Sequence, residues 1–192
     1  SPIDLQAREK MLLASTYAGI AFTRANVGYV HAIAHQFGGR YHTPHGLANA
    51  IVLPHVLRFS LPDITDRLAT LAVRAGLGDE GESEDVLAQK FIDGVVALER
   101  DLGIPTHLDA LQEADIPALA RAACHEAHTG YPVPRYLTQE GCEGLIRLVL
   151  PPPAAAGARA RPKAAAPKKA APKAATPAKS TARPGRAPRT PK

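Results

Sequence analysis

The sequence predicts an all-α fold, and two observations carry this prediction. Apolar residues recur at intervals of three and four along the first 150 residues, as on the buried face of a helix. No segment alternates apolar and polar residues over the length of a strand, and no strand–helix–strand rhythm is visible. There is also no GxGxxG or Walker-type phosphate loop. A dinucleotide-binding domain is therefore not expected within this chain.

Charge divides the 192 residues into two parts. Residues 1–150 contain 12 Lys and Arg against 18 Asp and Glu, whereas residues 151–192 contain 11 Lys and Arg and no acidic residue. The second part consists mainly of Ala, Pro, Lys and Arg, and it has no aromatic residue and no Leu, Ile, Val or Met. Such a segment cannot bury enough apolar surface to offset the entropy of ordering it. We expect a helical domain over residues 1–150 and a disordered basic tail over residues 151–192.

Several classes of protein are excluded by composition. Two cysteines, Cys124 and Cys142, are too few for a disulfide scaffold and do not form a CxxC pair. No stretch approaches the roughly 18 apolar residues that cross a bilayer, and the N-terminus has no apolar signal region. The expectation is a cytoplasmic protein without a membrane partner.

Six or seven helices are expected in residues 1–150, because two or three of them lie between residues 61 and 126. Their ranges are 4–24, 27–37, 45–59, 61–75, 83–102, 115–126 and 138–150. Small residues at positions 14, 18, 19 and 21 predict that the first helix packs closely against another helix. Gly38 and Gly39 are expected to end the second helix. Pro54 is expected to kink the third.

Five of the eight histidines lie in HAIAHQFGGRYHTPHGLANAIVLPH, residues 31–55. His31 and His35 are four residues apart. On a helix their directions around the axis therefore differ by about 40°, and both side chains project from one face. Position 32 is Ala, so the general-base Glu of a zinc-protease HExxH motif is absent. His45 follows a glycine pair and a proline, which lets the next helix begin beside the first. Two imidazoles from adjacent helices form a candidate divalent-metal site, and ordinary hydrogen-bonded histidines are the alternative.

The remaining histidines suggest other roles. His42 lies between the candidate ligands, where it can line a cleft or make a polar loop contact. His55 lies beside Pro54 on an apolar helix and is expected to be packed. A second group, Cys124, His125 and His128, has no further ligand nearby and is not expected to bind metal.

The stretch GYVHAIAHQFGGRYHTPHGLANAIVLPHVLRF, residues 28–59, closely resembles the histidine-bearing signature of the iron-containing (group III) alcohol dehydrogenases. The similarity continues on both sides, down to YPVPRYLTQEGCEGLIRLVL, and covers about residues 1–150. Phe37 is a small departure, since the family usually carries Leu there.

This resemblance implies a two-domain enzyme with an N-terminal α/β domain for NAD or NADP and a C-terminal all-helical domain. The helical domain holds a divalent metal, iron by preference with zinc possible, through one Asp and three His. Carried over by motif, His31 and His45 are the last two ligands and His35 is the active-site histidine beside the metal. The Asp, the first His and the nucleotide-binding glycines are expected upstream of residue 1. We expect the rings of His31 and His45 to point into one cavity lined by His35.

The resemblance implies oxidation of an alcohol, or reduction of an aldehyde or ketone, by an enzyme of which this chain is the metal-side half. The isolated chain is expected to be inactive, and a homodimer is a further expectation. The alternative is a non-catalytic protein that binds polyanions, including nucleic acid without sequence preference. Its basic tail resembles the arms of linker histones.

Overall fold

The computed structural model describes residues 3–152, and every regular element in that range is a helix, which confirms the all-α prediction. The elements are α1 (Leu5–Ala25), α2 (Tyr29–Tyr41), α3 (His45–Arg74), α4 (Glu84–Asp101), the 3₁₀ turn η1 (Glu113–Asp115), α5 (Ile116–Gly130) and α6 (Gln139–Arg147). The expected disorder of the basic tail falls almost wholly outside the described residues. No helix among the described residues is long and apolar enough to cross a membrane.

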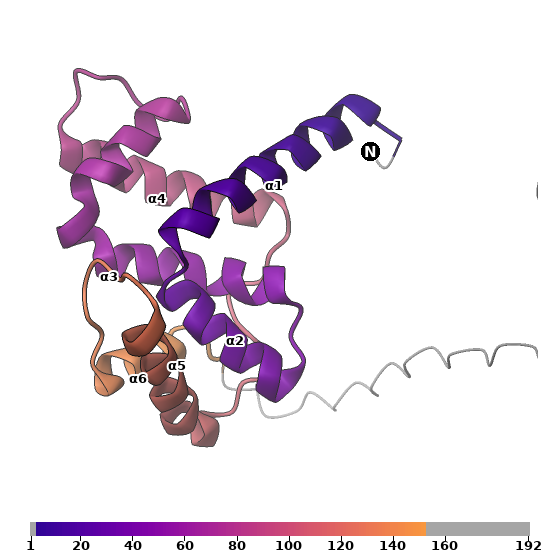
Figure 1. Cartoon of the computed structure of the whole chain (residues 1–192), viewed down its shortest axis with the longest axis vertical. Helices are drawn as coiled ribbons and strands as arrows, with labels where there is room; N and C mark the ends of the chain where they lie inside the picture. Colours follow the sequence, from indigo (N-terminus) through magenta and orange to yellow (C-terminus); the bar gives the residue numbers. More distant parts are fainter. Residues whose placement is uncertain (1–2, 153–192) are drawn as a thin grey trace, which may run out of the picture. The chain divides into compact units, whose positions relative to one another are not determined.

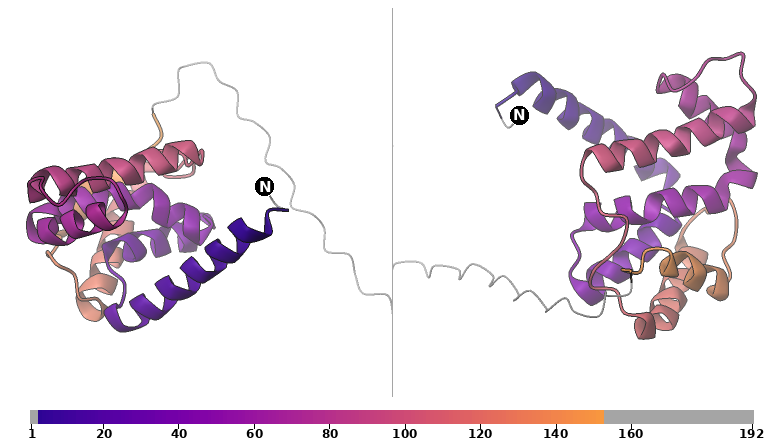
Figure 2. Two further views of the ribbon diagram at one scale, coloured as in Figure 1. Left: turned by 90° about the horizontal axis from the view of Figure 1, so that it is seen from above. Right: turned by 180° about the vertical axis from the view of Figure 1, so that it is seen from behind.

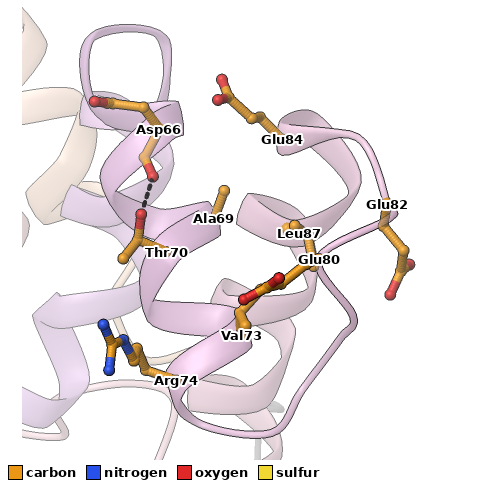
Figure 3. Close-up of a pocket in the computed structure, with 9 residues that line it drawn as sticks. All are labelled: Asp66, Ala69, Thr70, Val73, Arg74, Glu80, Glu82, Glu84 and Leu87. Carbon is orange, nitrogen blue, oxygen red and sulfur yellow. Dashed lines mark hydrogen bonds between the residues drawn. The ribbon is translucent and has the colours of Figure 1, made fainter.

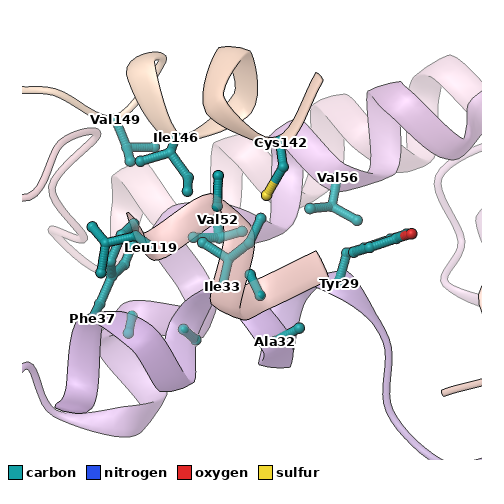
Figure 4. Close-up of a cluster of buried hydrophobic side chains, with 14 of the residues drawn as sticks. Tyr29, Ala32, Ile33, Phe37, Val52, Val56, Leu119, Cys142, Ile146 and Val149 are labelled. Carbon is teal, nitrogen blue, oxygen red and sulfur yellow. The ribbon is translucent and has the colours of Figure 1, made fainter. Parts of the chain in front are cut away.

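The main hydrophobic core surrounds α2 (Figure 4). Ile33 and Phe37 of α2 are buried to 1% and 0% exposure, and they meet side chains from α3, α5 and α6. Burying a side chain of this size stabilises a fold by about 1.5–3 kcal/mol. Phe37 is among the largest fully buried side chains of the described residues and lies in this core.

The two helices expected over residues 45–59 and 61–75 form one long element, α3, with a kink near its middle. The prediction of a kink at Pro54 was wrong, because the non-helical backbone lies at Ile64 (φ −139°, ψ 18°). Pro62 is two residues earlier, and its ring conflicts with the carbonyl of residue 58 in a regular helix. α3 lies beside α4 (Figure 2), and two small groups of buried side chains fill the contact between the two helices.

Arg135, in the loop before α6, braces the kinked part of α3. Its Nη1 donates to the carbonyl oxygen of Phe59 at 3.3 Å, and its guanidinium lies 5.0 Å from the centre of the Phe59 ring. Its Nε lies 3.7 Å from a carboxylate oxygen of Asp63. The loop and the kink therefore support each other.

The sequence predicted that the glycine pair ends the second helix, and this prediction was wrong. Gly38 and Gly39 lie inside α2, which continues to Tyr41. The chain turns instead at His42, in the left-handed conformation (φ 56°), whose N–H donates to the carbonyl of Gly38 at 3.0 Å. A non-glycine residue at positive φ is uncommon, and His is among the residues that tolerate it best. The turn brings the start of α3 back beside α2.

The first helix makes no close packing with the rest of the described chain. α1 buries none of its residues, and it extends away from the bundle in Figure 1. Large apolar side chains on this helix and just before it are between 45% and 87% exposed. They are Ile3, Leu5, Met11, Leu12, Leu13, Tyr17, Ile20 and Phe22. The expectation that its small residues contact another helix is therefore not met within residues 3–152. A helix with apolar residues on more than one side is typically buried in a larger protein.

A polar cluster joins the end of α2 to the start of α5. The carboxylate of Asp115 accepts from Arg40 Nη2 at 2.9 Å, from Arg40 Nε at 3.2 Å and from the Tyr41 hydroxyl at 2.7 Å. Hydrogen bonds from Arg40 and then Tyr41 lower the pKa of Asp115 below its ordinary value of 3.8. This contact fixes α5 against α2.

Replacement of Asp115 by Asn should destabilise the chain at pH 7. The pKa of Asp115 is depressed in the folded state, so its contribution is present above pH 3.8 and is lost as the pH falls through the folded value. Urea midpoints at pH 7, 5 and 3 should show a deficit for Asp115→Asn that shrinks at pH 3. Asp66→Asn, in the middle of α3, is the control. An equal deficit at all three pH values would contradict the role given to the charge.

Candidate metal centre

Three histidine rings meet at the corner between α2 and α3. His31 and His35 lie one turn apart on α2, and His45 is the first residue of α3. The ring centres are 5.2 Å apart for His31 and His45, 5.5 Å for His35 and His45, and 5.8 Å for His31 and His35. An imidazole bonded at about 2.1 Å places its ring centre about 3.2 Å from a metal, so two tetrahedral ligands have ring centres about 5 Å apart. The spacing of the rings suits a shared ion.

The cluster is open to the surface, whereas the sequence led us to expect a cavity. His31 is half-buried, the side chain of His35 is 40% exposed, and His45 is exposed. Burial, followed by the neighbouring rings of His45 and His35, lowers the pKa of His31. His31 therefore favours the neutral form that binds metals.

His35 is oriented by a carboxylate on α5. Its Nδ1 lies 2.7 Å from Glu126 Oε1. The same carboxylate accepts from the Tyr131 hydroxyl at 2.6 Å and from Gln36 Nε2 at 3.0 Å. A histidine whose second nitrogen donates to a carboxylate is the usual arrangement next to a metal.

The electrostatics of Glu126 decide which nitrogen of His35 carries the proton. Burial acts to raise the pKa of Glu126, but hydrogen bonds from Tyr131, His35 and Gln36 outweigh it and leave the pKa below its ordinary value. The same contact raises the pKa of Tyr131 to about 12. Glu126 is thus ionised at neutral pH and can only accept. Nδ1 of His35 therefore donates its hydrogen to Glu126 Oε1.

His45 contacts Asn49 one turn further along α3. Asn49 Nδ2 lies 3.1 Å from His45 Nε2 and donates to the His45 carbonyl at 2.9 Å. Asn49 Oδ1 is buried and has no hydrogen-bond partner in the described part of the chain. Ligation through Nε2 would require the contact with Asn49 to break.

The residues present fit part of a metal site. Neutral imidazole nitrogens suit zinc, iron and copper. Across residues 3–152, however, no set of three or more His, Cys, Asp or Glu side chains is arranged to hold an ion. Two imidazoles leave most of the coordination sphere to other donors.

The other histidines lie elsewhere. His42 forms the turn after α2, and His55 is half-buried on α3. On α5, His128 Nε2 lies 2.7 Å from the Tyr29 hydroxyl, and His125 is exposed. Cys124 Sγ contacts the carbonyl of Leu137 at 3.6 Å. Within residues 3–152, Cys124, His125 and His128 are not arranged as a group of three ligands around one point.

Sequence reasoning missed the residues that support the cluster. Gln36 follows His35 directly, and Glu126 lies between His125 and His128 in the sequence, but neither position carries a pattern that marks it as a partner of His35. A carboxylate 91 positions from His35 becomes its partner only when α5 packs on α2. Asn49 had a local signal, since a residue four after His45 shares its face of the helix.

A second feature of the fold is an open pocket of about 300 Å³ between α3 and the start of α4 (Figure 3). Its rim carries Glu80, Glu82 and Glu84, and none of its lining residues is a histidine. Glu82 is paired with Lys90. This pocket is unrelated to the histidine cluster.

Comparison with known proteins gives the family. The model of the "Fe-containing alcohol dehydrogenase family, C-terminal" matches residues 1–150. The 1,3-propanediol dehydrogenase of Klebsiella pneumoniae is 46% identical over 127 residues, which cover 65% of this chain and 33% of that protein. The NAD-dependent methanol dehydrogenase of Bacillus methanolicus is 34% identical over 149 residues, 77% of this chain and 39% of that protein.

The fold is found in solved structures of the same kind. A crystal structure of 1,3-propanediol oxidoreductase matches with a TM-score of 0.73 and 40% identity, covering 77% of this chain and 39% of that one. The chain thus spans about a third of the length of the relatives it matches. The helical bundle with its histidine corner belongs to the iron-containing alcohol dehydrogenase family and corresponds to the C-terminal domain of that family.

Proposed function

We propose that residues 1–150 act as the metal-side domain of an NAD(P)-dependent dehydrogenase that interconverts a small alcohol and its aldehyde or ketone. The observation that carries this proposal is the convergence of His31, His35 and His45, with ring centres 5.2–5.8 Å apart, in a chain of this family. The relatives named for propanediol and methanol support a small alcohol as the substrate class.

The three histidines take different roles in this proposal. His31 and His45 would hold a divalent metal, with iron as the first candidate and zinc as the second. When bound, such an ion supplies Lewis-acid polarisation of an alcohol oxygen. His35 keeps its proton on Nδ1, facing Glu126, and can accept or return a proton at Nε2 beside the ion.

The remaining parts of the reaction must come from outside residues 1–150. Two imidazoles do not complete a coordination sphere, and the described residues form no nucleotide-binding α/β fold. We assign the nicotinamide site and the further metal ligands to the part of the enzyme that corresponds to the unmatched two thirds of the relatives. The exposed apolar residues of α1 support this assignment, because they provide a large surface that such a part can cover. A homodimer and a cytoplasmic location remain proposals alongside it.

The metal proposal predicts weak binding that depends on His45. Zinc should bind the chain more tightly than iron and less tightly than copper, following the general order for divalent metals. His45→Ala should weaken zinc binding at least tenfold, about 1.4 kcal/mol, in calorimetric titrations. His125→Ala, an exposed histidine on α5, is the matched control and should leave the affinity unchanged. An equal loss of zinc affinity in both variants would show that His45 is not a ligand.

The catalytic proposal predicts that activity appears only when the missing part is supplied. Residues 1–150 would be joined behind the unmatched N-terminal region of the Klebsiella 1,3-propanediol dehydrogenase. The chimera should oxidise 1,3-propanediol with NAD, measured as NADH absorbance, and His45→Ala should abolish that turnover. The chain of 192 residues alone should show none. NAD-dependent turnover by the isolated chain that His45→Ala removes would overturn the proposal that it is incomplete.

We propose a separate function for residues 151–192, and this proposal rests on their composition alone. Its 11 positive charges without a negative one suit binding to nucleic acid of any sequence. Binding of the full chain to duplex DNA should fall steeply as salt rises, and deletion of residues 151–192 should abolish it without changing the circular dichroism of the helices. Equal binding by the full and shortened chains at low salt would dismiss this function of the tail.

A further inference from the structure

Asn49 lies one turn after His45 on α3, and its side chain leans back toward that histidine. Every Cα–Cβ bond of a helix tilts toward the N-terminus, so a residue reaches the side chain and the carbonyl of the residue four positions earlier. Asn49 Nδ2 lies 2.9 Å from the His45 carbonyl oxygen and 3.1 Å from His45 Nε2. Ala48 and Val52 are buried in the main core and fix the rotation of this part of α3. The position of Asn49 against His45 is therefore set by the core.

The orientation of the Asn49 amide follows from its contact with the backbone. A carbonyl oxygen only accepts hydrogen bonds, so the amide group that lies 2.9 Å from the His45 carbonyl must be the NH₂ group. The exchanged orientation would place Asn49 Oδ1 against that oxygen, and two acceptors repel each other. Oδ1 is buried and has no hydrogen-bond partner within residues 3–152, so no donor there favours the exchange. Nδ2 therefore faces His45.

The NH₂ group of Asn49 decides which nitrogen of His45 carries hydrogen. Nδ2 has two hydrogens and only donates, so it donates to Nε2 as well as to the carbonyl. Nε2 must then be free of hydrogen, and the hydrogen of the neutral ring lies on Nδ1. Free histidine prefers the opposite tautomer, with hydrogen on Nε2. The contact with Asn49 thus reverses the ordinary preference of the ring.

We propose that Asn49 is a positioning residue that holds His45 in the Nδ1–H tautomer and thereby makes Nε2 the nitrogen available to a metal. A ring nitrogen that carries hydrogen does not coordinate, and the hydrogen bond at one nitrogen sets the use of the other. The tautomer is a property of the metal-free chain. The use of Nε2 as a ligand rests on the proposed function, in which His45 holds the ion.

NMR of the full chain, labelled with ¹⁵N in its histidines and free of metal, tests the tautomer. At pH 8.5 an ordinary imidazole is neutral. Correlations from the ring C–H protons to both ring nitrogens distinguish a nitrogen that carries hydrogen from one that does not, and the signals missing in His45→Ala identify the ring. Nδ1 of His45 should carry the hydrogen. Hydrogen on Nε2 in the unaltered chain would overturn the proposal.

Variants of Asn49 test whether it is the cause. Asn49→Asp replaces the donor by an acceptor of the same shape, so hydrogen should move to Nε2 of His45. Asn49→Ala should restore the preference of free histidine, also with hydrogen on Nε2. Gln6→Glu makes the same chemical change on an exposed part of α1 and should leave the Nδ1–H tautomer in place. Retention of that tautomer in folded Asn49→Ala, with unchanged circular dichroism, would show that Asn49 does not set it.

A zinc titration of the same sample separates this inference from the metal proposal. Zinc should shift the Nε2 signal of His45 more than its Nδ1 signal. A larger shift at Nδ1 would overturn the assignment of Nε2 as the ligand. A ring in the Nδ1–H tautomer that does not respond to zinc at either nitrogen would contradict the metal proposal, whereas the role of Asn49 in fixing the tautomer would be supported.

Discussion

The arrangement of the histidines depends on the packing of α2 into the core. Ala32, Ile33 and Phe37 are buried to 1% exposure or less and fix how α2 is rotated against α3 and α5. Once that rotation is fixed, His31 and His35 must project from the adjacent face toward the start of α3. The turn at His42 then places His45 beside them. Hydrophobic packing therefore positions the polar site, and a change at Phe37 would alter it without touching a histidine.

The packing of α5 on α2 also brings the carboxylate of Glu126 to His35. Glu126 reaches His35 only because α5 lies on α2, and Asp115 holds the other end of this pair of helices through Arg40 and Tyr41. The two carboxylates are alike in that hydrogen bonds hold both pKa values below the ordinary range. Asp115 fixes α5 against α2, and Glu126 orients the imidazole of His35. This division explains how a surface-exposed cluster can retain a defined geometry.

Local patterns predicted the helices and the three histidines, because apolar periodicity and i, i+4 spacing are properties of neighbouring residues. They did not predict the end of α2, where hydrogen bonds at His42 outweigh two glycines, or the kink at Ile64, which Arg135 supports from 71 positions away. Glu126 was missed for the same reason, because its carboxylate meets His35 only when α5 packs on α2. The exposed face of α1 shows the limit most plainly, since its small and apolar residues predict a helix partner that residues 3–152 do not provide.

We propose that His31 and His45 jointly hold one metal ion at the corner of α2 and α3. Anomalous diffraction at the zinc absorption edge, from crystals of the chain soaked in zinc, tests it most directly. One strong peak is expected at about 2.1 Å from a nitrogen of each ring, with the remaining ligands supplied by solvent. A peak bound to only one of these histidines, or zinc found only at His125 or His128, would contradict it.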